Sequence, residues 1–100
     1  MSYPKIVRAE AIGEHIIRVE FTNQEIKDYD ISALIEKPMF APLQNLAFFR
    51  NFKVEPGGYG LVWNGDIDIS EYELWTKGKT AQIKGKTAFA SDSNRFPSAL

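Results

Sequence analysis

The chain has 100 residues, of which 44% are hydrophobic and 25% are charged, and its formal net charge is −1. This length fits one domain with a modest core, and a composition near the globular average excludes collagen-like, coiled-coil and fully disordered proteins. The absence of cysteine excludes disulfide frameworks, thiolate zinc sites and cysteine nucleophiles.

The sequence carries no segment typical of membrane insertion or export. No apolar run approaches the roughly 20 residues that a membrane span needs. The first residues, MSYPK, lack the apolar region of a signal peptide. We therefore expect a cytoplasmic protein that does not contact a membrane.

Charge is distributed unevenly along the chain. Residues 1–76 hold twelve acidic and seven basic side chains, a balance of −5, whereas residues 77–100 hold one acidic and five basic side chains, a balance of +4. Such asymmetry is typical of an interaction tail or of a solvated, flexible terminus. The near-neutral total therefore conceals an acidic body and a basic tail.

The first third of the chain reads as three strands. Residues 16–21, IIRVEF, alternate apolar and polar side chains with the period of two that is typical of a half-buried antiparallel strand. Residues 5–11 alternate more loosely, and residues 26–31 form a weaker strand because their acids disfavour pairing. Short turns join the three segments, so we expect an antiparallel meander.

Two short helices are predicted next. Ser32 is a candidate N-cap for one helical turn over residues 33–37, which Pro38 ends. A second helix over residues 42–49 begins with Pro42 at its first position, where a missing N–H costs nothing. Apolar residues recur at helical spacing in this segment and would pack on the sheet: Leu43, Leu46 and Phe49.

A hairpin, a strand and a final helix follow. Residues 52–56 and 59–63 flank the turn signal Gly57-Gly58. Asn64-Gly65-Asp66 predicts a tight turn before a strand over residues 67–69, because Asn and Gly accept a positive φ. Ser70 and Glu73 have capping-box spacing, which predicts a helix over 71–75.

These elements predict an α+β fold with one antiparallel sheet of about five strands and two or three short helices. We expect a domain over residues 1–76, followed by a basic, low-apolar tail over residues 77–100 that is flexible or ordered by a partner. The predicted core consists of Val7, Ile17, Val19, Phe21, Leu34, Leu46, Phe49, Val54, Leu61 and Trp63.

No pattern in the sequence points to catalysis. Gly78-Lys79-Thr80 and Gly85-Lys86-Thr87 resemble the end of a phosphate-binding loop, but Glu73 and Thr80 stand where that loop needs its earlier glycine. His15, the single histidine, has no nucleophile motif to serve. We therefore expect no catalytic residues and no cofactor.

Alternating oxygen side chains run from Asn64 through Asp66 and Asp68 to Ser70, as in the first half of a calcium loop. The sixth and twelfth positions of an EF-hand loop would be Gly and Glu, but here they are Ile69 and Trp75. Turn and cap chemistry explains the same residues, so we predict no metal site. A calcium-binding regulatory protein remains an alternative.

The aromatic residues have mainly acidic neighbours, which repel phosphate and argue against direct nucleic-acid binding by residues 1–76. Most of them are expected in the core, although tryptophan is over-represented at protein-binding hot spots. With the basic tail, they suggest the following partner-binding residues: Trp63, Asn64, Asp66, Trp75, Lys79, Lys84 and Lys86.

Residues 63–75, WNGDIDISEYELW, together with the early Asp-Ile-Ser and the Leu-rich helix before Phe-x-Val, resemble a bacterial family. That family is catalogued as domain of unknown function 2442, and the resemblance covers residues 4–76. It implies a small α+β domain that stands alone or precedes a helix-turn-helix domain. Some members are encoded beside a second small protein, in pairs resembling toxin–antitoxin modules. The family has no established catalytic residues.

The resemblance and the residues together lead to the hypothesis of a non-enzymatic binding or regulatory module. It would recognise another protein or a second copy of itself, and an antitoxin-like subunit of a two-gene module is one form of this hypothesis. An uncharacterised small enzyme is a further alternative.

Overall fold

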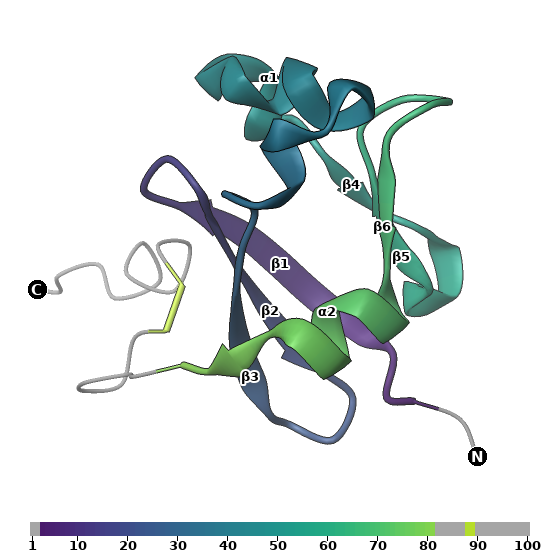
Figure 1. The fold of residues 1–100 in the computed structure, drawn as a ribbon. Coiled ribbons are helices and arrows are strands. Elements are labelled where there is room, and N and C mark those ends of the chain that lie inside the picture. Colours follow the sequence, from purple (N-terminus) through teal and green to yellow (C-terminus); the bar gives the residue numbers. More distant parts are fainter. Residues whose placement is uncertain (1–2, 82–87, 90–100) are drawn as a thin grey trace, which may run out of the picture.

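A four-stranded antiparallel sheet, sheet A, is built mainly from the first third of the chain (Figure 1). The computed structural model describes residues 3–81 and 88–89. Sheet A has the strand order β1-β2-β3-β7. Its strands are β1 (Ile6–Ile12), β2 (Ile16–Phe21), β3 (Ile26–Asp30) and β7 (Lys79–Thr80). The predicted meander over residues 5–31 is confirmed.

A second antiparallel sheet, sheet B, has three strands in the order β4-β5-β6: β4 (Lys53–Val54), β5 (Gly60–Val62) and β6 (Asp68–Ser70). The prediction of an α+β fold is confirmed, but the single sheet of about five strands is wrong, because the strands divide between two sheets. The remaining elements are η1 (Leu34–Glu36), η2 (Pro38–Gln44) and η3 (Pro56–Gly58), which are 3-10 helices, and the α-helices α1 (Leu46–Phe49) and α2 (Glu71–Lys77).

The inner face of sheet A forms one wall of the core. Ile17, Val19 and Phe21 alternate along β2 and are buried, as their spacing predicts. The remaining core residues come from β1, η2, α1 and α2, from in or beside β3, and from β5, β6 and the turn between them. Figure 1 shows α2 crossing this arrangement at one end, with α1 and the 3-10 turns at the other.

A β-bulge in β1 changes which side chains face the core. Ile6 pairs with Phe21 and Arg8 with Glu20, so β1 advances two residues where β2 advances one. Ile6 therefore takes the inward position, and Val7 points outward with 54% of its surface exposed. The prediction that Val7 is buried is wrong, because strict alternation is interrupted at the bulge.

The predicted helix over 42–49 is interrupted at Asn45, which is extended at φ −80° and ψ 116°. The Asn45 side chain accepts a hydrogen bond from Phe48 N at 3.0 Å and so starts α1 as an N-cap. Helical spacing is lost across this break. Phe49 is buried as predicted, whereas Leu46 is 36% exposed, which corrects its place in the predicted core.

The predicted cap of the first helical turn is also wrong. Ser32 N and Oγ both donate to the Asp30 carboxylate, at 2.8 and 2.6 Å, and η1 starts from Ala33 instead. These two hydrogen bonds lower the pKa of Asp30. Leu34, predicted as core, is partly buried, as is Val54, and both pack against the core from its edge.

The hairpin predicted at Gly57-Gly58 joins β4 to β5, with η3 as its turn. Gly58 has a φ of +77°, and a Cβ at this position would lie 2.7 Å from Ile6 N and against the Ile6 carbonyl oxygen. Only glycine therefore lets this turn approach β1. The contact links sheet B to the first strand of sheet A.

The final predicted helix is confirmed as α2, and Ser70 is its N-cap, accepting from Glu73 N at 3.2 Å. The Glu73 carboxylate reaches across to β3, where Tyr29 Oη donates to it at 2.7 Å. Burial and this hydrogen bond raise the pKa of Tyr29 well above its ordinary value. The bond fixes α2 on the inner side of sheet A.

Described structure continues past residue 76. Lys79–Thr80 form β7 on the edge of β3, and Phe89 is 1% exposed. The division into a domain over 1–76 and a tail over 77–100 stays a prediction, because most of the latter segment lies outside the described residues. In the part of the chain that is described, no helix is long and apolar enough to cross a membrane.

Candidate functional site

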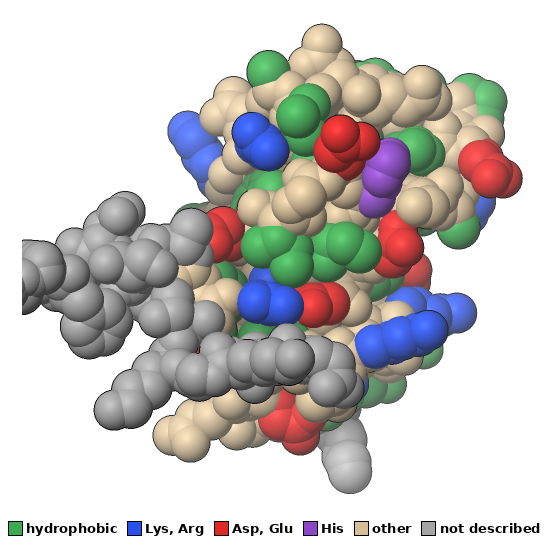
Figure 2. Space-filling model, turned by 90° about the vertical axis from the view of Figure 1, so that its left-hand side faces the viewer, with side chains coloured by type: hydrophobic (Ala, Val, Ile, Leu, Met, Phe, Trp, Pro, Cys, Tyr) green, Lys and Arg blue, Asp and Glu red, His purple; other side chains and the backbone are tan. Residues whose placement is uncertain are grey.

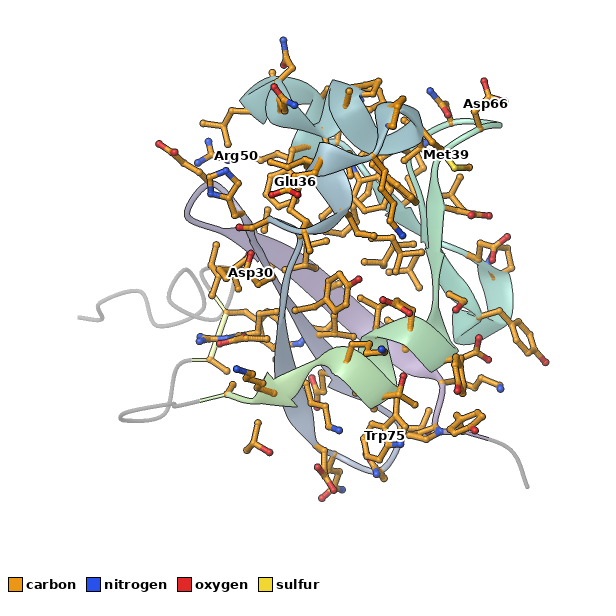
Figure 3. The ribbon with its side chains drawn as sticks, in the orientation of Figure 1. Asp30, Glu36, Met39, Arg50, Asp66 and Trp75 are labelled. Atoms are coloured by element: carbon orange, nitrogen blue, oxygen red, sulfur yellow. The ribbon has the colours of Figure 1, made fainter. Side chains whose placement is uncertain are left out.

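Among the residues that the structure describes, those predicted to bind a partner do not form one surface. Asp66 and Trp75 lie at opposite ends of the molecule (Figure 3). Lys79 lies in β7, and Lys84 and Lys86 lie outside the described residues. The turn around Asp66 and the helix that carries Trp75 are therefore two separate regions of the described surface.

Trp63 and Asn64 have structural partners. Trp63 is buried, and its Nε1 donates to the Phe49 carbonyl at 2.8 Å, which ties β5 to the end of α1. Trp63 also lines an open groove of about 660 Å³ with Val54 and Val62. Asn64 Oδ1 accepts from Asp66 N and from Ile67 N, at 2.8 and 2.9 Å, and so forms the predicted turn.

The oxygen side chains considered as a calcium loop are thus used locally. Asn64 holds its turn, and Ser70 caps α2. Over residues 3–81 and 88–89, no group of three or more His, Asp or Glu side chains is placed to hold a metal ion. His15 is exposed in the turn between β1 and β2.

Trp75 closes one end of the core. Its ring meets Phe21 edge to face, with the centroids 5.1 Å apart, and Lys27 Nζ lies 3.7 Å from its centroid. The same Nζ donates to the Trp75 carbonyl oxygen at 2.8 Å, near the carboxyl end of α2 where a cation is favoured. Trp75 is half-buried, so only part of its ring faces solvent.

Three tyrosines gather at a surface that the sequence did not reveal. Tyr3, Tyr59 and Tyr72 are 41%, 55% and 50% exposed, and they come from the N-terminal segment, the β4–β5 turn and α2. With Lys5 and Glu71, they form what we call the tyrosine surface. Each tyrosine stands alone in the sequence, so only the fold brings them together.

The tyrosine surface is organised around Lys5. Lys5 Nζ donates to Glu71 Oε2 at 2.8 Å and lies 4.7 Å from the Tyr59 ring centroid. Tyr3 and Tyr72 meet edge to face, with centroids 4.8 Å apart and planes at 76°. These contacts hold exposed rings in fixed positions, as aromatic pairs and cation–π contacts do.

Local sequence offers a partial signal for two of these rings. Tyr72 precedes the buried Leu74 by two positions on α2, which places it on a different side of the helix. Tyr59 follows the turn glycines, where side chains generally face solvent. Tyr3 gives no such signal.

The outer face of sheet A carries a row of alternating charges across four strands. The row, which we call the charge ladder, runs through cross-strand neighbours in the order Glu10, Arg18, Asp28 and Lys79. Figure 2 shows acidic and basic side chains intermixed on this side of the molecule.

Within the charge ladder, Arg18 is held by two side-chain hydrogen bonds. Its Nε and Nη2 donate to both oxygens of Asp28, at 2.8 and 2.9 Å. This hydrogen-bonded pair, together with the charge of Glu10, raises the pKa of Arg18. The predicted residue Lys79 stands at the end of the charge ladder, beside Asp28 on the neighbouring strand.

Comparison with protein families identifies a match that covers most of the chain. The sequence model of a family described as "Protein of unknown function (DUF2442)" matches residues 6–80. No curated protein matches the chain. No solved structure matches it either.

Proposed function

The chain belongs to the DUF2442 family of proteins of unknown function, and we propose that it is a non-enzymatic binding module that recognises another protein through the tyrosine surface. In this proposal the partner is a protein rather than a nucleic acid or a small molecule. The observation that carries it is the convergence of Tyr3, Tyr59 and Tyr72 around one ion pair.

Tyrosine is suited to this role because its ring offers a large apolar area and its hydroxyl can satisfy a polar partner. Tyr and Trp are enriched among the residues that dominate protein–protein binding energies. The three rings are about half exposed, so each still has apolar area to bury.

Preorganisation supports the same proposal. The edge-to-face pair of Tyr3 and Tyr72, and the position of Lys5 beside Tyr59, restrict the rings before any partner arrives. A surface that is already ordered loses less side-chain entropy on association. Lys5 and Glu71 add one charge of each sign at the centre, which suits a partner with matching polar groups.

We further propose an antitoxin-like role, in which the partner is a second small protein encoded beside this one. Coexpression tests this form of the proposal directly. The chain and the product of the adjacent gene are produced together with an affinity tag on the chain alone, and the captured material is separated by size. The two proteins are expected to elute as one complex of fixed stoichiometry.

A variant of the tyrosine surface and a control variant elsewhere test whether the tyrosine surface is the binding site. The double variant Tyr59→Ser and Tyr72→Ser is expected to weaken binding at least about 100-fold, since two hot-spot truncations each remove on the order of 2 kcal/mol. Met39→Ser removes an exposed apolar side chain from η2 and should leave binding unchanged. Failure to form a complex, or equal loss with Met39→Ser, would contradict the proposal.

A further inference from the structure

Residues Ala88 and Phe89 lie against the outer face of sheet A, next to the charge ladder. Arg18 Nη1 donates to the Ala88 carbonyl oxygen at 2.8 Å. The Arg8 guanidinium carbon lies 4.1 Å from the centroid of the Phe89 ring. Phe89 is 1% exposed, although residues 77–100 contain few other large apolar side chains. Two arginines thus hold one backbone group and one ring.

Both arginines are fixed by carboxylates on a neighbouring strand. Arg18 makes its two-oxygen contact with Asp28, and Arg8 Nε donates to Glu20 Oε1 at 2.9 Å. A guanidinium held in one orientation presents a flat face to an aromatic ring and a fixed N–H to a carbonyl. The outer face therefore has the properties of a preformed site.

The two contacts recognise different parts of the bound segment. The hydrogen bond from Arg18 is made to a backbone carbonyl. Any residue that fits sterically could supply this group. The position of Arg8 over the ring requires an aromatic side chain, since the attraction comes from the π-electrons of the ring face. Together they select a segment in which an aromatic residue directly follows the residue whose carbonyl is held.

We propose that the outer face of sheet A is a docking site for an alanine–phenylalanine element, and that Ala88–Phe89 fills it in this chain as an intramolecular ligand. Recognition comes from local chemistry and not from the covalent connection. The site therefore binds the same element on a separate peptide once Phe89 is removed. The docking site uses none of the residues of the tyrosine surface. A test of the docking site is therefore independent of the proposed partner.

A double-mutant cycle in the full chain tests the contact between Arg8 and Phe89. The variants are Arg8→Gln, Phe89→Leu and their combination, and the measurement is the thermal midpoint. Leucine keeps an apolar side chain but has no ring. The combined loss is expected to be about 2–4 °C smaller than the sum of the single losses, as a cation–π contact in a domain of this size predicts.

Arg50 provides the control, because it is exposed and lies at the end of α1. A cycle between Arg50→Gln and Phe89→Leu should be additive. Additivity in the Arg8 cycle as well would overturn the proposal, since the ring would then make no specific contact.

A peptide with the sequence of residues 85–92, GKTAFASD, tests recognition without the covalent connection. Its binding is followed by fluorescence anisotropy, with wild-type chain and with the full-length Phe89→Ala variant. The peptide should bind the variant at least about tenfold more tightly, because the wild-type site is already occupied. A peptide with alanine in place of the phenylalanine should bind neither chain.

Three results would overturn the proposal. They are equal affinity for wild type and variant, no binding to the variant at 1 mM peptide, and equal binding of the alanine peptide. Circular dichroism of the Phe89→Ala variant establishes that its fold is retained. If it is not, Phe89→Ser or Phe89→Leu replaces it in the same titration.

Discussion

The Tyr29 hydroxyl donates a 2.7 Å hydrogen bond to the Glu73 carboxylate, and this bond joins β3 to α2 across 44 residues of sequence. Tyr29 is buried, so its hydroxyl has exchanged water for one charged acceptor. The bond therefore fixes the last helix on the sheet that the first third of the chain forms.

Replacing Tyr29 with phenylalanine should lower the free energy of unfolding by about 1–3 kcal/mol, because Glu73 loses a hydrogen bond in a partly buried position. Urea denaturation measures the change. Tyr59→Phe serves as the control, because the Tyr59 side chain is largely exposed, and it should change stability by less than about 0.5 kcal/mol. Equal effects would mean that the bond to Glu73 contributes nothing.

The same tyrosine predicts a dependence on alkaline pH. Its pKa is raised by burial and by the bond to Glu73, whereas in the unfolded chain it titrates near about pH 10. The stabilisation is therefore complete below that pH and is lost as the pH rises above it. The difference in urea midpoint between wild type and Tyr29→Phe should be constant up to about pH 10 and should shrink as the pH rises further. A constant difference would contradict the assignment.

Phe49 and Leu46 make a matched pair within α1. Phe49→Ala should cost about 3–5 kcal/mol, because it removes a fully buried ring and leaves a cavity. Leu46→Ala should cost less than about 1 kcal/mol, because the side chain is partly exposed. Denaturant midpoints of the two variants make the comparison. A larger loss for Leu46→Ala would contradict the finding that the break at Asn45 turns Leu46 toward solvent and Phe49 toward the core.

Alanine substitutions at three glycines distinguish the cost of a positive φ from the cost of a steric collision. Gly65→Ala should be neutral, because a Cβ there meets nothing within 4 Å and its φ is not positive. Gly13→Ala should cost about 1–2 kcal/mol, because its φ is +67° in open space. Gly58→Ala adds a collision with the Ile6 backbone and should cost more than either, by thermal denaturation. Equal losses at Gly13 and Gly58 would show that the turn moves away from β1.

Two serines test the helix cap. Ser70→Ala should cost about 1 kcal/mol, because Ser70 Oγ accepts from Glu73 N at the start of α2. Ser32→Ala should cost less, because its hydroxyl bonds an exposed carboxylate and caps no helix. Chemical denaturation of both variants makes the comparison. A larger effect at Ser32 would contradict the cap assignment.

Sequence patterns predicted those elements that are determined by interactions between residues close together in the chain. The alternation over residues 16–21 located β2 because each inward residue of that strand faces the same core. The spacing of Ser70 and Glu73 located the start of α2, although Glu73 bonds Tyr29 and so serves a distant strand as well. The turn at Asn64 was located correctly, but the reason given for it was wrong, because neither Asn64 nor Gly65 has a positive φ. The Asn64 side chain forms the turn by accepting hydrogen bonds from nearby backbone N–H groups.

Features that depend on distant contacts were missed. Nothing in the alternation of β1 indicates a bulge, because Ile6 and Val7 are both suitable for the core and the pairing with Phe21 decides between them. Likewise, the close approach of Gly58 to Ile6 joins residues 52 positions apart, so no local pattern could indicate it. The tyrosine surface was missed for the same reason, since Tyr3, Tyr59 and Tyr72 become neighbours only in the fold.

The pairing of β7 with β3 has a consequence for how the protein is made. β1, β2 and β3 are neighbours in sequence and can pair soon after they leave the ribosome. β7, which pairs with the edge of β3, is synthesised much later. Glu73, which accepts the hydrogen bond from Tyr29, follows Tyr29 by 44 residues. At about 5–20 residues per second, the synthesis of the 44 residues from Tyr29 to Glu73 takes roughly 2–9 s, and β7 follows shortly afterwards. During that time the nascent chain exposes an unpaired strand edge and a tyrosine hydroxyl without its final acceptor, so chaperone binding is expected to be concentrated in this interval.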